Sequence, residues 1–167
     1  MNNATSASIF INYRSSDEHV AAVLLDNTLS ARFGEQNVFL DSKSMAPGTP
    51  FDEALRTAVR DCDVLLVVIG SRWLTSADEH GRRLIDHRGD WVRLEIVEAE
   101  RAGKHVVPVL VGDVPPLAKV ALPAAIRSLA GKQFLRLRPR DGRADLDQIV
   151  ARTRTLAPRL DGFLSPA

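Results

Sequence analysis

The run Asp63-Val64-Leu65-Leu66-Val67-Val68-Ile69-Gly70 constrains the fold more than any other part of this chain. It is an unbroken apolar run, rich in β-branched residues, and too short for a typical helix. A strand with one face in water would alternate apolar and polar residues, and this run does not. It therefore predicts a strand that is buried on both faces, as in the middle of a parallel sheet.

Helical and strand-like patterns alternate along the rest of the chain. The expected strands cover residues 8–13, 37–41, 63–70, 106–111 and 133–137. The expected helices cover residues 18–33, 51–60, 91–102 and 145–156, with a short one at 122–129. This order predicts an α/β protein with a flavodoxin-like three-layer fold, in which helices cover both faces of a five-stranded parallel sheet. In the fourth strand, Pro108 suggests an edge position or a strand irregularity.

Length and composition set the outer limits. The 167 residues fit one domain, which we expect over residues 9–156, with a flexible tail at 1–8 and a tail or linker at 157–167. A formal net charge of +1 argues against nucleic acids and anionic membranes as partners. A single cysteine, the absence of a membrane-length apolar run and the absence of a signal peptide favour a cytoplasmic location.

One acidic residue stands out in the helix expected after Asp90, which is a good N-cap, and before Gly103, which is a good stop. Glu95 shares the apolar arc of this helix, and a carboxylate on a packing face is costly unless it is paired or opens onto a cavity. The remaining members of the arc are apolar: Trp91, Val92, Ile96, Ala99 and Ala102. Glu95 is therefore either a functional acid or half of a structural ion pair with an arginine such as Arg14.

Other chemistries have weaker support. The chain lacks the glycine-rich phosphate loops and the nucleophile-elbow motif. Acidic residues close to His80 and His87 do not follow a metal-ligand spacing, so a solvated charged loop is favoured and a metal site is not expected. Cys62 lies between two aspartates, which oppose thiolate formation. The ends of the first and third strands lack the acids that a phosphoacceptor receiver domain needs.

Four segments, in order and with suitable spacing, resemble the Toll/interleukin-1 receptor (TIR) domain family, in particular its bacterial NAD-cleaving members. They are Phe10-Ile11-Asn12-Tyr13-Arg14, Val38-Phe39-Leu40-Asp41 with the following Pro47-Gly48 loop, Asp90-Trp91-Val92-Arg93-Leu94-Glu95-Ile96, and Val106-Val107-Pro108-Val109. The resemblance covers nearly the whole chain, from about Ile9 to Leu156.

The resemblance implies a site and an activity. Glu95 occupies the position of the glutamate that breaks the nicotinamide–ribose bond of NAD+, with Trp91 as the tryptophan of the W-x-x-x-E pattern. The implied rim of the NAD+ pocket consists of Tyr13, Arg14, Asp41, Lys43, Ser44, Gly48 and Phe51. Residues 42–50 match the BB loop, which in this family makes subunit contacts and gates the site. The implied setting is bacterial immune or stress signalling.

The chemistry is reasonable on its own terms. The nicotinamide of NAD+ is cationic and leaves readily, so the two carboxylates of ordinary glycoside hydrolysis are not needed. One carboxylate can stabilise the oxocarbenium-like transition state, and an aromatic neighbour can exclude water or stack on a ring. NAD+ is then a substrate, and no cofactor is required. Structural roles remain open for several of these residues: packing for Trp91 and Trp73, turn capping for Asp41 and simple solvation for Arg14.

Two functions follow as hypotheses. The first is an NAD+ hydrolase that releases nicotinamide together with ADP-ribose, a cyclic isomer or both. The alternative is a non-catalytic interaction module that assembles with other TIR domains. In either case residues 42–50, with Met45 and Ala46 at their apolar centre, predict self-association. Basic residues near the C-terminus are expected to form only a solvated face: Lys132, Arg136, Arg138, Arg140 and Arg143.

Overall fold

The computed structural model describes residues 7–40 and 53–163 and forms the predicted α/β fold. Within these residues the sheet has five parallel strands in the order β2-β1-β3-β4-β5. They are β1 (Ile9–Asn12), β2 (Val38–Leu40), β3 (Val64–Ile69), β4 (His105–Val111) and β5 (Leu135–Leu137). The strand order reverses direction between β1 and β3, and such a switch point is where open α/β sheets bind ligands, beyond the carboxyl ends of the strands.

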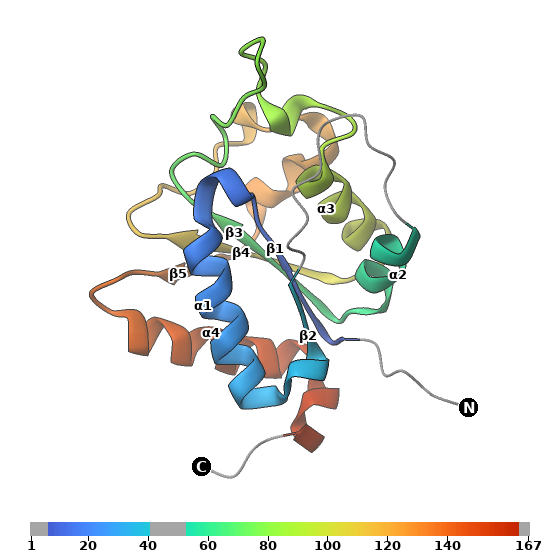
Figure 1. The fold of residues 1–167 in the computed structure, drawn as a ribbon, viewed down its shortest axis with the longest axis vertical. Coiled ribbons are helices and arrows are strands. Elements are labelled where there is room, and N and C mark those ends of the chain that lie inside the picture. Colours follow the sequence, from blue (N-terminus) through green and yellow to red (C-terminus); the bar gives the residue numbers. More distant parts are fainter. Residues whose placement is uncertain (1–6, 41–52, 164–167) are drawn as a thin grey trace.

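Helices cover both faces of this sheet, as predicted (Figure 1). One face packs against α1 (Ser15–Phe33) and α4 (Gly142–Leu156). The other face packs against α2 (Glu53–Asp61), α3 (Trp91–Arg101) and the 3-10 helix η4 (Ala124–Gly131). The long connection between β3 and α3 contains the short 3-10 helix η2 (Leu84–Asp86) and projects beyond the carboxyl ends of the strands (Figure 1).

Strand β3 is the centre of the molecule. All of its residues are buried, which confirms the prediction from its unbroken apolar run. Its side chains divide between the two cores. Leu65, Val67 and Ile69 contact the α2–α3 side, and the alternate residues Val64, Leu66 and Val68 contact the α1–α4 side. Hydrophobic burial on both faces fixes the position of this strand and of the residues that follow it.

Pro108 does not mark an edge strand. Strand β4 lies between β3 and β5, and Pro108 itself is paired in register with Val67 of β3. The pairing of β4 with β5 begins only at Val109, so the proline precedes the part of the strand that has neighbours on both sides. Pro108 has no backbone N–H to donate, but in this register it lies before the residues that pair with β5. A proline is therefore tolerated in this interior strand.

Helix α1 differs from the pattern expected for it. By helical spacing Val20 and Leu24 belong to an apolar repeat with Val23 and Leu29, but they are 80% and 42% exposed. The buried face instead carries Ala21, Ala22, Leu25, Leu29 and Phe33. Two alanines on the packing face let the helix backbone approach the sheet, and the larger side chains further along then fill the core.

The domain extends beyond both expected boundaries. Ala157 and Leu160, expected to lie in a tail with little to pack against, are fully buried, and the 3-10 helix η5 (Pro158–Phe163) follows α4 directly. That part of the prediction is wrong, because these apolar side chains complete the α1–α4 core. Ser8 is also buried, and its carbonyl oxygen accepts hydrogen bonds from the N–H groups of Asp63 and Val64. No helix within the described residues is long and apolar enough to cross a membrane.

Candidate active site

Helix α3 carries the candidate acid and begins where the sequence predicts. The Asp90 carboxylate accepts a hydrogen bond from the backbone N–H of Arg93 at 3.2 Å, which is an N-cap. Gly103, with φ of 69°, follows the helix. A glycine adopts this conformation without steric strain, so it terminates the helix as expected. Ala102 was assigned to the packing arc but is exposed, because the helix has already ended at this point.

Glu95 is buried on this helix, with a side chain only 4% exposed. Its Oε2 accepts a hydrogen bond of 2.6 Å from Nδ2 of Asn12, the last residue of β1. The same Nδ2 donates to the carbonyl oxygen of Val92 at 3.1 Å. Both N–H bonds of one neutral amide therefore hold the acid and the first turn of α3 against the end of the central sheet. Asn12 was not singled out as a site residue, and only its place at the end of a strand hinted at the role.

Arg14 does not pair with Glu95. Its guanidinium group forms two hydrogen bonds with the Asp90 carboxylate, from Nη1 at 2.9 Å and from Nη2 at 2.7 Å. Both side chains are buried, so the alternative of a solvated Arg14 is also wrong. This bidentate pair connects the chain after β1 to the N-terminus of α3, and it engages the arginine that was the candidate structural partner of Glu95.

A second buried acid on α3, Glu98, provides a contrast. Its Oε1 accepts a hydrogen bond of 2.5 Å from Nε of Arg60, and its Oε2 lies 3.8 Å from Nη1 of Arg56. Both arginines come from α2, where they are spaced by one turn on one face of the helix. Glu98 is therefore held by arginines of α2, and Glu95 accepts a hydrogen bond from the Asn12 amide at the end of β1.

The aromatic candidates divide between the two cores. Trp91 is buried in the α2–α3 core, on the same helix as Glu95 and one turn before it. Tyr13 packs in the opposite core, and its ring centroid lies 5.8 Å from that of His19. The structure therefore brings Trp91 and Arg14 to the end of α3 that carries Glu95, whereas the apolar contacts of Tyr13 are with the α1–α4 side. Trp73 is fully buried and serves packing, as expected.

The remaining candidate pocket residues lie outside the described residues. These are Asp41, Lys43, Ser44, Gly48 and Phe51, together with the whole loop of residues 42–50. Their assignments stay predictions.

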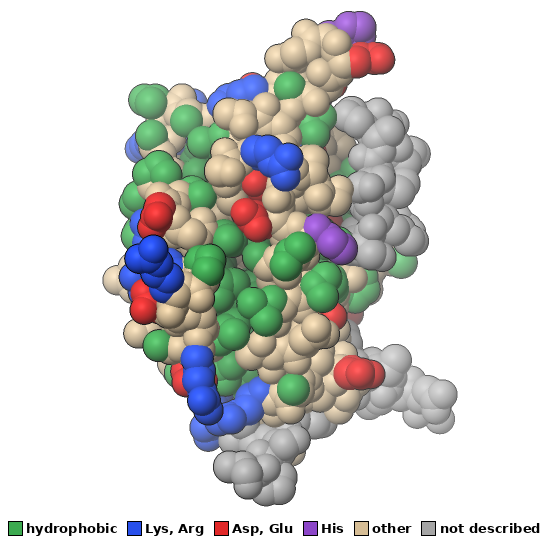
Figure 2. Space-filling view, turned by 60° about the vertical axis from the view of Figure 1, so that its left-hand side comes forward, with side chains coloured by type: hydrophobic (Ala, Val, Ile, Leu, Met, Phe, Trp, Pro, Cys, Tyr) green, Lys and Arg blue, Asp and Glu red, His purple; other side chains and the backbone are tan. Residues whose placement is uncertain are grey.

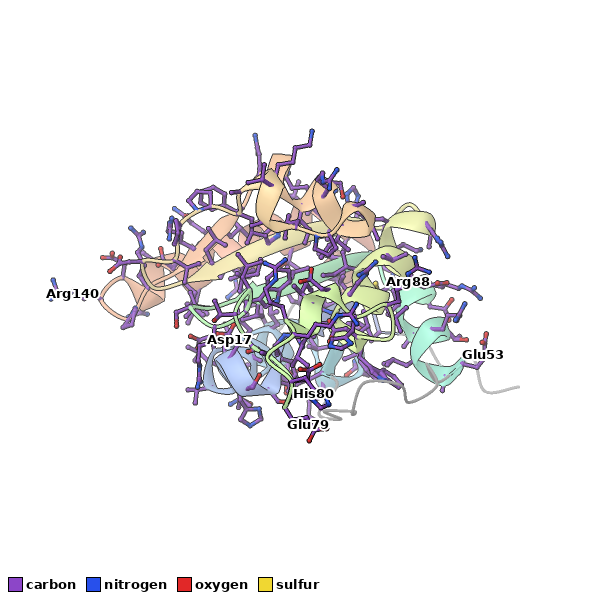
Figure 3. All side chains as sticks on the ribbon, turned by 90° about the horizontal axis from the view of Figure 1, so that it is seen from above. Asp17, Glu53, Glu79, His80, Arg88 and Arg140 are labelled. Carbon is purple, nitrogen blue, oxygen red and sulfur yellow. The ribbon has the colours of Figure 1, made fainter. Side chains whose placement is uncertain are left out.

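The charged loop between β3 and α3 is held by internal hydrogen bonds, including one arginine–aspartate ion pair. His87 lies 2.8 Å from Asp78, and Arg83 forms two hydrogen bonds with Asp86. Backbone N–H groups of Arg82 and His80 help to hold the pKa of Asp78 below its usual value. Glu79 and His80 lie together at the outer end of the loop (Figure 3). Within residues 7–40 and 53–163, the acidic, histidine and cysteine side chains form no cluster suited to a metal ion.

Cys62 is an interior residue. Its side chain is fully buried and its thiol donates to the carbonyl oxygen of Val59 at 3.0 Å. Burial raises the pKa of this thiol to about 12, and the neighbouring aspartates add to the shift. A thiol in this state is not a nucleophile at neutral pH.

The basic residues near β5 do more than form a solvated face. Arg136 donates to the carbonyl oxygens of Gly112 and Val114, and Arg138 forms a bidentate pair with the buried carboxylate of Asp145. Charged side chains of both signs are interspersed on the face shown in Figure 2, which agrees with a net charge of +1. Arg138 remains exposed, as expected of a solvated face, whereas Arg136 is half-buried, and both have partners that the fold brings close.

Comparison with known proteins agrees with this architecture. A solved structure of TIR domains, from the activated Roq1 resistosome directly recognizing the pathogen effector XopQ, aligns with a TM-score of 0.60 and 18% sequence identity. The alignment covers 88% of this chain and 99% of that one, and at this identity it supports the fold. No curated protein matches the sequence. A family model described as "TIR domain" matches residues 9–150, and the chain therefore belongs to the TIR domain family.

Proposed function

We propose that this TIR domain hydrolyses NAD+ at the nicotinamide–ribose bond, with Glu95 as the catalytic residue. The observation that carries the proposal is the position of Glu95, a buried carboxylate that Asn12 holds at the carboxyl end of β1, beside the switch point of the sheet. Nicotinamide is the leaving group. The other product is ADP-ribose, a cyclic isomer of it, or both. NAD+ is the substrate, and the mechanism requires no cofactor or metal.

The arginine partners of Glu98 make that acid the weaker candidate. Positive charge develops on the ribose as the cationic nicotinamide departs. A carboxylate in a site of low dielectric stabilises that charge strongly when a cation does not already compensate it. The two arginines near Glu98 compensate that carboxylate. The Asn12 amide holds the Glu95 carboxylate at the end of β1.

Substrate must reach a side chain that is 4% exposed. The proposed reaction therefore includes an opening of the surface above Glu95 before the ribose enters. In this proposal Trp91, one turn before Glu95, borders the site, and Arg14 fixes the start of α3 through Asp90. The family resemblance adds Asp41, Lys43, Ser44, Gly48 and Phe51 as substrate contacts, with Tyr13 at the rim.

A nicotinamide-release assay tests the proposal. The purified chain is incubated with NAD+ at high protein concentration, with and without a crowding agent, and nicotinamide is separated by liquid chromatography. Removal of the Glu95 charge by Glu95→Gln should lower the rate by about a hundredfold or more, a loss typical of a group that stabilises transition-state charge. Glu95→Ala should do the same, and circular dichroism should show a retained fold.

Glu98→Gln is the matched control, since it makes the same chemical change on the same helix. It should retain most of the activity. Equal losses in the two variants would assign the effect to helix stability and remove Glu95 from its role. A folded wild-type chain that releases no nicotinamide under any of these conditions would leave the non-catalytic interaction module as the better description.

A further inference from the structure

A cavity lies at the carboxyl ends of β3 and β4, on the opposite side of β3 from β1. Its volume is about 770 Å³, which is within the range of small-ligand pockets. The strand ends contribute Ile69 and Val111, and the loops above them contribute Leu74, Val114 and Leu117. Its lining does not include Asn12, Trp91 or Glu95. The cavity is therefore separate from the candidate NAD+ site and independent of the proposed function.

One wall of the cavity is held in place by hydrogen bonds. Nη1 of Arg136 donates to the carbonyl oxygens of Gly112 and Val114, at 3.1 and 2.8 Å. The backbone N–H of Gly112 donates to the carbonyl oxygen of Leu137 at 2.8 Å. The start of the loop after β4 is thus tied to β5, so this wall is preorganised for a ligand.

Glu18 provides one of the acidic groups of this cavity. Its side chain lies over Gly70, where an added Cβ atom would come within 2.2 Å of the Glu18 Cγ. The absence of a side chain at Gly70 therefore makes room for Glu18. Among the described residues, the Glu18 carboxylate has neither a hydrogen bond nor a salt bridge. An acid at the edge of a cavity whose pKa is shifted by burial and by neighbouring charges is a candidate for a binding role.

The adjacent acid, Asp17, differs from Glu18 because its carboxylate has hydrogen-bond partners. Its carboxylate accepts hydrogen bonds from the N–H groups of Gly70 at 2.7 Å and of Arg72 at 2.8 Å. Asp17 lies where α1 meets the loop after β3 (Figure 3). It fixes the first turn of α1 and thereby the position of Glu18. Burial, followed by the charge of Asp17, raises the pKa of Glu18, and Arg72 acts in the opposite direction.

The charges at the cavity select the ligand class. Glu18 and Asp113 are the charged residues that line it among the described residues, and both are acidic. They disfavour phosphate-bearing molecules and favour a cation. The aliphatic and proline side chains around them favour an apolar body. We propose that this cavity binds a small organic cation with an apolar body, with Glu18 as its counter-ion.

Nuclear magnetic resonance titration of the full chain tests this directly. The probe is cyclohexylamine, which is protonated at neutral pH, and the matched neutral probe is cyclohexanol. The amine should shift the backbone amide signals of residues lining the cavity, including Ser71, Leu74 and Gly112, and should bind about tenfold more tightly than the alcohol. Binding of the amine should weaken as the pH falls through the raised pKa of Glu18, and binding of the alcohol should not.

Three variants complete the test. Glu18→Gln should weaken amine binding by about tenfold and leave alcohol binding unchanged. Glu79→Gln, at an exposed acid outside the cavity, should change neither. Ala118→Trp, which adds volume at the lining, should weaken both probes. Equal binding of amine and alcohol, an unchanged affinity in Glu18→Gln, or shifted signals elsewhere in the chain would overturn the proposal. NAD+ cleavage does not enter any of these measurements.

Discussion

Asn12 and Glu95 are joined by a hydrogen bond of 2.6 Å, although they are separated by 83 positions in the sequence. The bond connects the end of a central strand to the second turn of α3. Since the same amide group also donates to the carbonyl oxygen of Val92, Asn12 fixes the helix and the acid together. Asn12 therefore helps to fix the position of the candidate catalytic carboxylate.

Replacement of Asn12 should affect stability and activity together. Asn12→Leu keeps a similar volume but removes both donors, and it leaves a buried carboxylate and a buried carbonyl oxygen without this partner. We expect a loss of about 1–3 kcal/mol in the free energy of unfolding, measured with urea, and a reduced kcat for nicotinamide release. Asn12→Asp should be more damaging to the fold, because it places a second carboxylate beside Glu95.

Asn27→Leu is the control for these variants, since it makes the same substitution at an exposed position of α1. It should alter neither the free energy of unfolding nor the kcat for nicotinamide release. An Asn12→Leu protein with wild-type stability and wild-type kcat would show that the amide does not position Glu95.

The Arg14–Asp90 pair should show strong energetic coupling. Asp90→Asn retains a good N-cap residue, so it isolates the loss of charge from the loss of the cap. It leaves the buried Arg14 guanidinium uncompensated, and we expect a cost of about 3–5 kcal/mol in unfolding free energy. The double variant Arg14→Met, Asp90→Asn should be less destabilised than the sum of its two single variants. Additive effects in this double-mutant cycle would mean that the pair contributes nothing beyond its separate side chains.

Assembly should increase activity. If residues 42–50 contact another subunit, the specific activity for NAD+ cleavage rises with protein concentration, and Met45→Asp or Gly48→Pro flattens that rise. Initial rates per mole of protein across about a hundredfold dilution measure this effect. Val120→Asp provides a matched control, because Val120 is an apolar residue that is 95% exposed in another part of the domain. Constant specific activity at all concentrations, with unchanged behaviour of both loop variants, would limit the loop to the pocket of its own subunit.

The Arg138–Asp145 pair predicts a pH dependence of stability. Hydrogen bonds from the Arg138 side chain and backbone hold the pKa of Asp145 below its usual value. A carboxylate with a lowered folded-state pKa contributes stability above its ordinary pKa and loses that contribution as the pH falls through the folded-state pKa. The difference in unfolding free energy between the wild type and Asp145→Asn should therefore be constant from pH 7 to about 5 and shrink below about pH 4.

Asp147→Asn, at an exposed position of the same helix, is the comparison for this series. It should track the wild type at every pH. A difference between wild type and Asp145→Asn that persists unchanged into strong acid would show that the pair does not stabilise the folded state through its charge.

The predictions that succeeded rest on local periodicity. The burial of β3 follows from its unbroken apolar run, and the alternation of strands and helices predicts the layered fold. The burial of Glu95 follows from its place on the apolar arc of a helix whose start at Asp90 is encoded by its own carboxylate. Helix geometry relates residues a few positions apart, so the sequence alone determines which side chains share a face.

The choice of partners was decided by tertiary structure. The sequence suggested Arg14 as a possible partner of Glu95. In the fold Arg14 pairs with Asp90, and Glu95 accepts a hydrogen bond from the amide of Asn12. The same limit applies to apolar residues, because local periodicity did not predict that Val20 is exposed and that Ala157 is buried. Several side chains could serve as a partner on chemical grounds. The direction in which side chains at each strand end point toward the neighbouring helix determines which of them makes the contact. That direction depends on contacts between segments distant in sequence, and such contacts leave no periodic pattern in the chain.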